Sequence, residues 1–214
     1  MMTAWMRPRL IAITDESWLP ASQLARRLRR LSALAAPGSV ALLLRDHSLS
    51  ARARLALGAA LRDAAREHGQ ALWVADRLDL ALLLEADGLH LGEASVSART
   101  ARGWLREGMH VSRAWHQVAL ESAPLEELHG VDALLVSPVL AARKGRPALG
   151  LPTFGALGEQ LRARHQAYPL YALGGVTADN AAACLEAGAT GVAAIAAALA
   201  DEPAPLLAAL GCLR

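Results

Sequence analysis

Short apolar runs alternate with longer amphipathic segments along the chain. Each apolar run spans four to six residues, as is typical of strands buried on both faces, and apolar residues recur at helical spacing between the runs. The pattern predicts strands at residues 10–13, 40–44, 71–75, 88–91, 109–112, 131–136, 169–173 and 191–195. It predicts helices at residues 20–35, 51–68, 78–85, 98–106, 154–165, 178–187 and 197–210.

Alternating strands and helices are typical of parallel strands joined by crossover helices. Eight strands in 214 residues match a small (β/α)8 barrel, whereas a doubly wound sheet of this length has fewer strands. We therefore expect an α/β protein with a single TIM-barrel domain over residues 1–214. Active sites of this architecture lie on the loops that follow the strands, so polar residues there are the first candidates.

Composition restricts the cellular context and the partners. A hydrophobic content of 54% excludes disorder for most of the chain, and no apolar run approaches the ~18 residues of a membrane span. The net charge is only +2, and the arginines are spread over amphipathic segments, so we expect no nucleic-acid partner. Cys184 and Cys212 lack CxxC spacing and residues 1–8 lack signal-peptide features, which indicates a cytoplasmic protein with reduced cysteines. The apolar segment 193–210 allows a homodimer face.

Glycines follow the last two predicted strands. The chain reads Leu-Gly-Gly-Val at 173–176, with Gly174 and Gly175, and Gly-Val-Ala-Ala-Ile-Ala at 191–196. Glycine lets the backbone approach an anion closely, and free N–H groups at the start of the last predicted helix carry partial positive charge. These two loops commonly form a phosphate site in barrels, so we expect one here.

Positive charge is concentrated in the irregular stretch at 137–152, after the sixth strand. Lys144 is the only lysine of the chain, and Arg143 and Arg146 flank it. A lysine neutralises a phosphate or diphosphate as a compact charge, while arginine adds paired hydrogen bonds. The loop is either such an anion site or a solvated surface loop.

Other polar residues stand near the ends of the second to fifth strands. Arg45 is an anion clamp or the partner of a nearby carboxylate, and Asp76 is a magnesium ligand or the N-cap of the next helix. His90 lies within the fourth strand, as expected for a core histidine. Ser112 ends the fifth predicted strand and either donates to a substrate oxygen or starts a helix, and His116 just beyond it could transfer a proton.

Together these motifs resemble the thiamine phosphate synthase and TenI family, over nearly the whole chain. The segment 75–92, which contains Ala-Asp-Gly-Leu-His-Leu-Gly at 86–92, resembles the family's "ND…ADG(V/I)HLGQ". The sequences at 171–176 and 186–193 resemble its "AIGG(I/V)" turn and "AGADGVAV" strand. Ser-Pro-Val-Leu at 137–140 resembles its "GPVF".

The resemblance implies a transferase that joins a hydroxymethylpyrimidine diphosphate to a thiazole phosphate and releases diphosphate, with Mg²⁺ as helper. Arg45 and Lys144 would then stabilise the leaving diphosphate, Ser112 would contact it, and Asp76 would bind magnesium. The backbone of four residues would hold the thiazole phosphate: Gly174, Gly175, Ile195 and Ala196. A carbocation-like pyrimidine forms as diphosphate departs, so stabilising that anion is the principal task.

The chain departs from the family pattern at several positions. The family's lysine two residues after Arg45 is His47, its asparagine before Asp76 is Ala75, and its second metal-binding acid falls on Ser95 with Glu93 nearby. Its threonine-rich loop becomes Ala-Ala-Arg-Lys at 141–144.

Two alternatives remain from the same resemblance. One is a TenI-like thiazole tautomerase, which needs a proton shuttle: the TenI histidine falls on Ala114, and His116 lies two residues further on. The other is a module that binds a thiazole phosphate, has lost catalysis and serves regulation.

Overall fold

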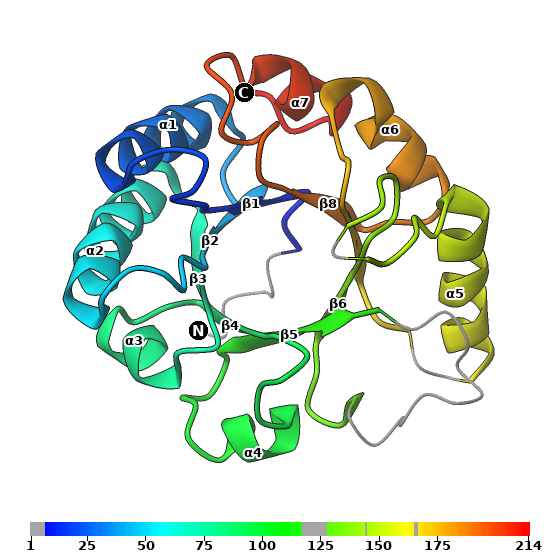
Figure 1. Cartoon of the computed structure of the whole chain (residues 1–214), viewed down its shortest axis with the longest axis horizontal. Coiled ribbons are helices and arrows are strands. Elements are labelled where there is room, and N and C mark those ends of the chain that lie inside the picture. The colour runs from blue at the N-terminus through cyan, green and yellow to red at the C-terminus, as the bar shows by residue number, and fades with distance from the viewer. Residues whose placement is uncertain (1–6, 117–127, 144, 165–166) are drawn as a thin grey trace.

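A computed structural model describes residues 7–116, 128–143, 145–164 and 167–214, and eight parallel strands close into a barrel in it. Neighbouring strands pair in sequence order, and β1 pairs with β8 to complete the ring. Figure 1 looks into this ring, with the helices outside it. The strands are β1 (Leu10–Ile13), β2 (Val40–Leu44), β3 (Ala71–Ala75), β4 (Gly88–Leu91), β5 (His110–Trp115), β6 (Ala133–Val136), β7 (Leu170–Leu173) and β8 (Gly191–Ala194).

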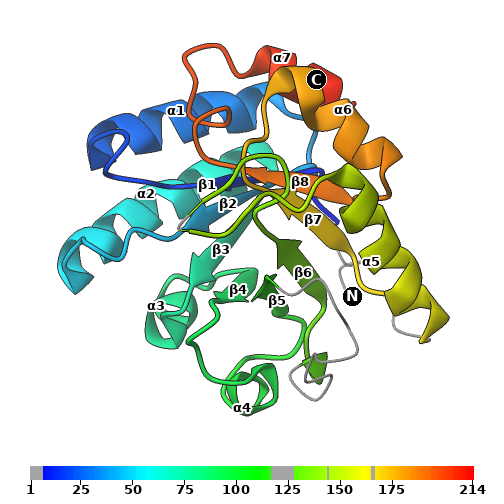
Figure 2. The same ribbon diagram turned by 45° about the vertical axis from the view of Figure 1, so that its right-hand side comes forward.

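The helices cover the outer face of the barrel, and Figure 2 shows α1 and α2 lying along β1 and β2. Leucines of the amphipathic helices pack in one cluster with the outward side chains of the strands. The helices are α1 (Ala21–Leu34), α2 (Ala51–His68), α3 (Leu78–Leu83), α4 (Ala98–Arg102), α5 (Leu151–Ala163), α6 (Ala178–Glu186) and α7 (Ala204–Ala209). Among the described residues, no helix combines the length and apolar character needed to cross a membrane.

Inward side chains of alternate strand residues fill the barrel interior. Trp73 and Tyr171 meet edge to face there, with ring centroids 6.5 Å apart. Gly88 makes room for them, since a Cβ at this position would lie 2.8 Å from ring atoms of Trp73. The interior is therefore a packed core.

The predicted TIM barrel is confirmed, but several predicted element boundaries are wrong, including those of the last helix and of β5. The predicted helix at 197–210 is a turn at 196–199 followed by the short α7, because Pro203 and Pro205 lack the N–H groups that a helix from residue 197 would need. β5 runs three residues beyond its predicted end at Ser112, so Ser112 lies inside a strand and starts no helix.

The apolar residues of the 193–210 segment are mostly used within the chain. Leu199, Leu206, Leu207 and Leu210 are buried in the core cluster. The two cysteines are also buried and unpaired with each other, as predicted. A homodimer stays a prediction.

Candidate functional site

The carboxyl ends of the strands bring the predicted site residues to one end of the barrel. Arg45 follows β2, and its backbone N–H donates to the Thr14 hydroxyl (2.9 Å). Its guanidinium Nη2 lies 2.8 Å from Asp15 Oδ2, at the end of β1. Arg45 therefore has the carboxylate partner that the sequence left open, while part of its side chain stays exposed to an incoming anion.

Asp76 follows β3 in a tight turn. Its φ is +60°, a left-handed conformation that is uncommon for residues other than glycine. Carboxylate Oδ1 accepts hydrogen bonds from the Gly92 N–H (2.8 Å) and the Ser95 hydroxyl, and Oδ2 lies 3.5 Å from Nε2 of His47. α3 begins without a side-chain cap, so the N-cap alternative for Asp76 is wrong. The carboxylate instead faces the loops after β2 and β4.

His90 and Ser112 meet inside the barrel. His90 Nδ1 lies 3.0 Å from the Ser112 hydroxyl oxygen, and both side chains are buried. Burial lowers the pKa of His90 to about 4, although the negative charge of Asp76 opposes the shift. His90 is therefore a neutral core histidine, as predicted. Contact between Ser112 and a diphosphate stays a prediction.

His116 is the first residue after β5, so strand alternation carries it on the same face as Ser112. Its Nδ1 lies 2.7 Å from the Ser137 carbonyl oxygen and 3.2 Å from the Ser137 hydroxyl oxygen, and its Nε2 lies 3.9 Å from Glu93 Oε2. Glu93 also pairs with Arg146 (2.8 Å), and this hydrogen bond lowers the pKa of Glu93. These contacts join the loops after β4, β5 and β6.

The loop after β6 is bonded to the glycine turn after β7. The N–H groups of Leu140 and Ala141 donate to the Gly174 carbonyl (2.9 and 3.2 Å), and the side-chain amide of Asn180 donates to the Gly175 carbonyl (3.0 Å). Both glycines have positive φ, +101° and +80°. A Cβ on Gly175 would lie 2.7 Å from the Ala141 Cβ. The positive φ and this close contact each require glycine at position 175.

Backbone N–H groups remain available after β7 and β8. Within the described ranges, Gly174 and Gly175 enter hydrogen bonds through their carbonyl groups, and so does Ile195, whose carbonyl accepts from Leu199 (2.9 Å). Gly175 and Ala196 are exposed, so no side chain seals the two loops. β7 and β8 are neighbours in the ring, which brings both sets of donors to one side of the barrel. This arrangement suits a phosphate group.

Lys144 lies outside the described residues. The residues on either side of it form a narrow hairpin in which the backbones of Arg143 and Arg146 exchange two hydrogen bonds of 3.0 Å. Arg146 of this hairpin pairs with Glu93, which follows β4. The positively charged loop therefore lies against the loop after β4.

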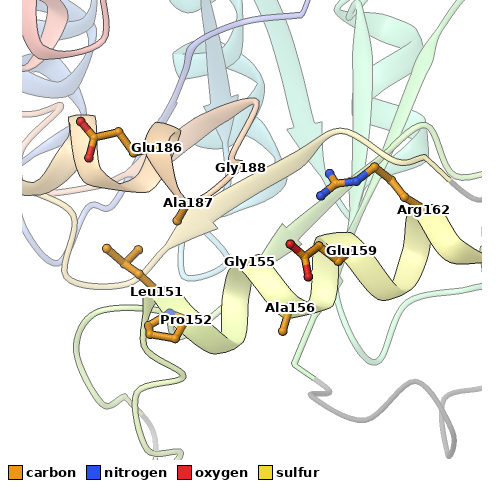
Figure 3. A pocket seen from close by; sticks show the side chains of 9 residues that line it. All are labelled: Leu151, Pro152, Gly155, Ala156, Glu159, Arg162, Glu186, Ala187 and Gly188. Carbon is orange, nitrogen blue, oxygen red and sulfur yellow. The ribbon is translucent and has the colours of Figure 1, made fainter.

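A groove of about 470 Å³ lies elsewhere, on the outer helix layer (Figure 3). It runs between α5 and the end of α6, where Glu159 and Arg162 stand opposite Glu186. None of the predicted site residues lines it.

Comparisons with known proteins identify the family. The family described as "Thiamine monophosphate synthase" matches residues 10–198. The chain belongs to this family. A thiamine-phosphate synthase of Thermus thermophilus is 38% identical over 192 residues, which cover 89% of both chains. That of Albidiferax ferrireducens is 34% identical over 94% of this chain and 89% of its own. A solved thiamine phosphate pyrophosphorylase from Pyrococcus furiosus has the same fold, with a TM-score of 0.78, 24% identity and 96% coverage of both chains.

Within this member of the thiamine monophosphate synthase family, sequence reasoning missed three residues that shape the site. Asp15 follows β1, so the rule applied to the other strand ends would have found it. Ser137 was considered only as part of a motif, and its contact with His116 joins residues 21 positions apart. Arg54 lies on the buried face of α2, since Leu57, Gly58 and Leu61 follow it at helical spacing, so the helical period could have placed it there.

The family's magnesium requires oxygen donors, and one carboxylate fits it. No group of three or more His, Cys, Asp or Glu side chains that could hold a metal ion occurs in the described part of the chain. Mg²⁺ is commonly held by one or two carboxylates together with substrate phosphates. Asp76 suits that shared mode, since Oδ1 is fixed by Gly92 and Ser95 while Oδ2 lies 3.5 Å from His47 Nε2. Burial lowers the pKa of His47, which favours its neutral form.

Proposed function

We propose that this protein is a thiamine phosphate synthase, which joins a hydroxymethylpyrimidine diphosphate to a thiazole phosphate. The bond between the pyrimidine methylene carbon and diphosphate breaks, a bond from that carbon to the thiazole ring forms, and diphosphate leaves. The main support is the family match over residues 10–198, on a barrel whose strand ends present donors for two anionic groups. No general base is required.

The backbone N–H groups after β7 and β8 would hold the thiazole phosphate, namely those of Gly174, Gly175, Ile195 and Ala196. Such donors bind a phosphate without a neutralising side chain. Arg45, and Lys144 as the resemblance implies, would stabilise the departing diphosphate. Mg²⁺, when bound, would neutralise further diphosphate charge, and Asp76 is the residue placed to share it.

The direct test is a turnover assay. Purified protein incubated with both substrates and Mg²⁺ should release thiamine phosphate and diphosphate in equal amounts. Asp76→Asn should lower kcat/KM by about 10²-fold, since it removes charge stabilisation of the leaving group. Asp79→Asn is the matched control: it lies three residues along and pairs with Arg77 (2.5 Å) outside the site, so it should stay within twofold. Absence of product from the native protein would refute the proposal, and thiazole phosphate binding without turnover would favour the regulatory module.

One observation favours a tautomerase as the second candidate. A carbonyl oxygen only accepts, so the Nδ1 of His116 that lies 2.7 Å from the Ser137 carbonyl must carry a proton. This fixes the tautomer and leaves Nε2 to accept or return a proton beside Glu93. Exchange between thiazole carboxylate phosphate tautomers that is lost in His116→Gln, without any synthase product, would establish this activity instead.

A further inference from the structure

The turn that presents Asp76 is held from beneath by a buried arginine. Arg54 on α2 is only 3% exposed, and its Nη2 donates to the Ala75 carbonyl at 2.6 Å. The same carbonyl accepts the Arg77 N–H at 2.7 Å, which closes a three-residue turn around Asp76. Because Asp76 has a φ of +60°, the turn is strained, and strained turns persist only when neighbouring groups hold them.

Arg54 also carries a positive charge that is buried beneath this turn. Burial lowers the pKa of Arg54, the positive charge of Arg77 adds to this effect, and the carboxylates of Asp76 and Asp46 oppose it. Its Nε is buried without a hydrogen-bond partner among the described residues. A buried cation is costly unless nearby negative charge compensates it. The carboxylates of Asp76, Asp46 and Asp79 therefore compensate the charge of Arg54, and the attraction acts in both directions.

We propose that Arg54 is a positioning residue that holds the Ala75–Asp76 turn so that the Asp76 carboxylate is oriented toward the magnesium diphosphate. This inference rests on the proposed function for its ligand. It assigns no contact between Arg54 and substrate. Arg54 acts through the Ala75 carbonyl and through its charge.

The same helix contains a matched control. Arg62 lies eight residues along α2 and is 7% exposed, and it also donates to a backbone carbonyl, in its case from Nε to Leu84 at 3.0 Å. Its Nη1 lies 3.0 Å from Asp87 Oδ2, just before β4 begins. Arg62 therefore resembles Arg54 in burial and bonding but serves the opposite end of the barrel.

The test compares Arg54→Met with Arg62→Met by calorimetric titration with magnesium diphosphate, which requires no turnover. We expect both variants to lose stability in urea, and only Arg54→Met to weaken binding, by tenfold or more. Arg62→Met should bind within twofold of the native protein. Arg54→Lys, which keeps the charge and a donor, should restore affinity to within about threefold.

A double variant separates positioning from general loosening of the fold. In the Asp76→Asn background, Arg54→Met should change the affinity by less than twofold, because the carboxylate it positions is gone. Equal losses in the Arg54 and Arg62 variants, or no magnesium diphosphate binding by the native protein, would overturn the inference. If Arg54→Met does not fold, Arg54→Gln and Arg62→Gln make the same comparison. A native protein that binds but does not turn over would refute only the proposed function.

Discussion

Acid should destabilise this barrel through His90. The imidazole is buried inside the ring at the level of Ser112, and burial is the main cause that lowers the pKa of His90 from 6.5 to about 4. Positive charge at Arg45, Arg113 and His116 lowers it further, while Asp76 acts in the opposite direction. The folded protein therefore keeps His90 neutral at pH values where the unfolded chain protonates it.

The sign and the size of the effect follow from proton linkage. Between pH 6.5 and about 4 the unfolded chain binds a proton that the native state does not, so the free energy of unfolding falls as the pH falls. One pKa unit corresponds to about 1.4 kcal/mol, so His90 alone should remove about 3 kcal/mol of stability by pH 4. This is a large share of the ~5–15 kcal/mol that holds a typical domain together.

The assay is urea unfolding of the native protein and of His90→Gln at a series of pH values from 7.5 to 4. Gln keeps a hydrogen-bonding side chain and does not titrate. The remaining carboxylates and histidines, His47 and His110 among them, contribute to both proteins, so the difference between the two curves isolates His90. Native protein should lose about 3 kcal/mol more than His90→Gln over this range. Curves that stay parallel within about 0.5 kcal/mol would show that the imidazole is not held neutral.

Two glycine substitutions test the packing and the proposed phosphate turn. Gly88→Ala places a Cβ 2.8 Å from Trp73 ring atoms, so urea unfolding should show a loss of about 1–3 kcal/mol, and unchanged stability would contradict the packed interior. Gly175→Ala adds a contact of 2.7 Å with the Ala141 Cβ at a φ of +80°, and calorimetry should show weaker inorganic phosphate binding. Gly108 has a similar φ of +81°, and a Cβ there would meet no heavy atom within 4 Å. Gly108→Ala should therefore lower stability without changing phosphate affinity. Equal phosphate affinity in the two variants would contradict the assignment of the phosphate turn.

The barrel could be predicted from sequence because each strand signal is local. Runs such as 40–44 and 71–75 are apolar on both faces, and the structure places β2 and β3 at these bounds. The errors arise where a residue's partner is distant. Arg113 is too polar to extend the predicted strand, but its guanidinium donates to the Val96 carbonyl (3.3 Å), so β5 continues through it. α5 begins at Leu151, before the predicted residue 154, because Pro152 is tolerated in a first helical turn.

The site was predictable to the level of single residues and not to the level of contacts. Position after a strand was enough to nominate Arg45, Asp76 and His116. It could not show that Asp76 bonds to Gly92 and Ser95, since these residues lie 16 and 19 positions away and meet only when β3 and β4 pair. The helical period places Arg54 on the buried face of α2 with Leu57 and Leu61, but it could not show the hydrogen bond to the Ala75 carbonyl.

Two kinds of group that could bind the anionic parts of the substrates lie at different places around the ring. Neutral backbone N–H groups lie after β7 and β8, while Arg45 and Asp76 lie after β2 and β3 and Arg146 lies in the loop after β6. In a closed ring of eight strands, β3 is directly opposite β7. A phosphate that stays bound throughout the reaction needs only steady hydrogen bonds, whereas a departing diphosphate gains charge and needs cations close to it. Under the proposed assignments, the monophosphate and the diphosphate would bind on opposite sides of the ring, and the new bond would form over the barrel axis, near His90 and Ser112.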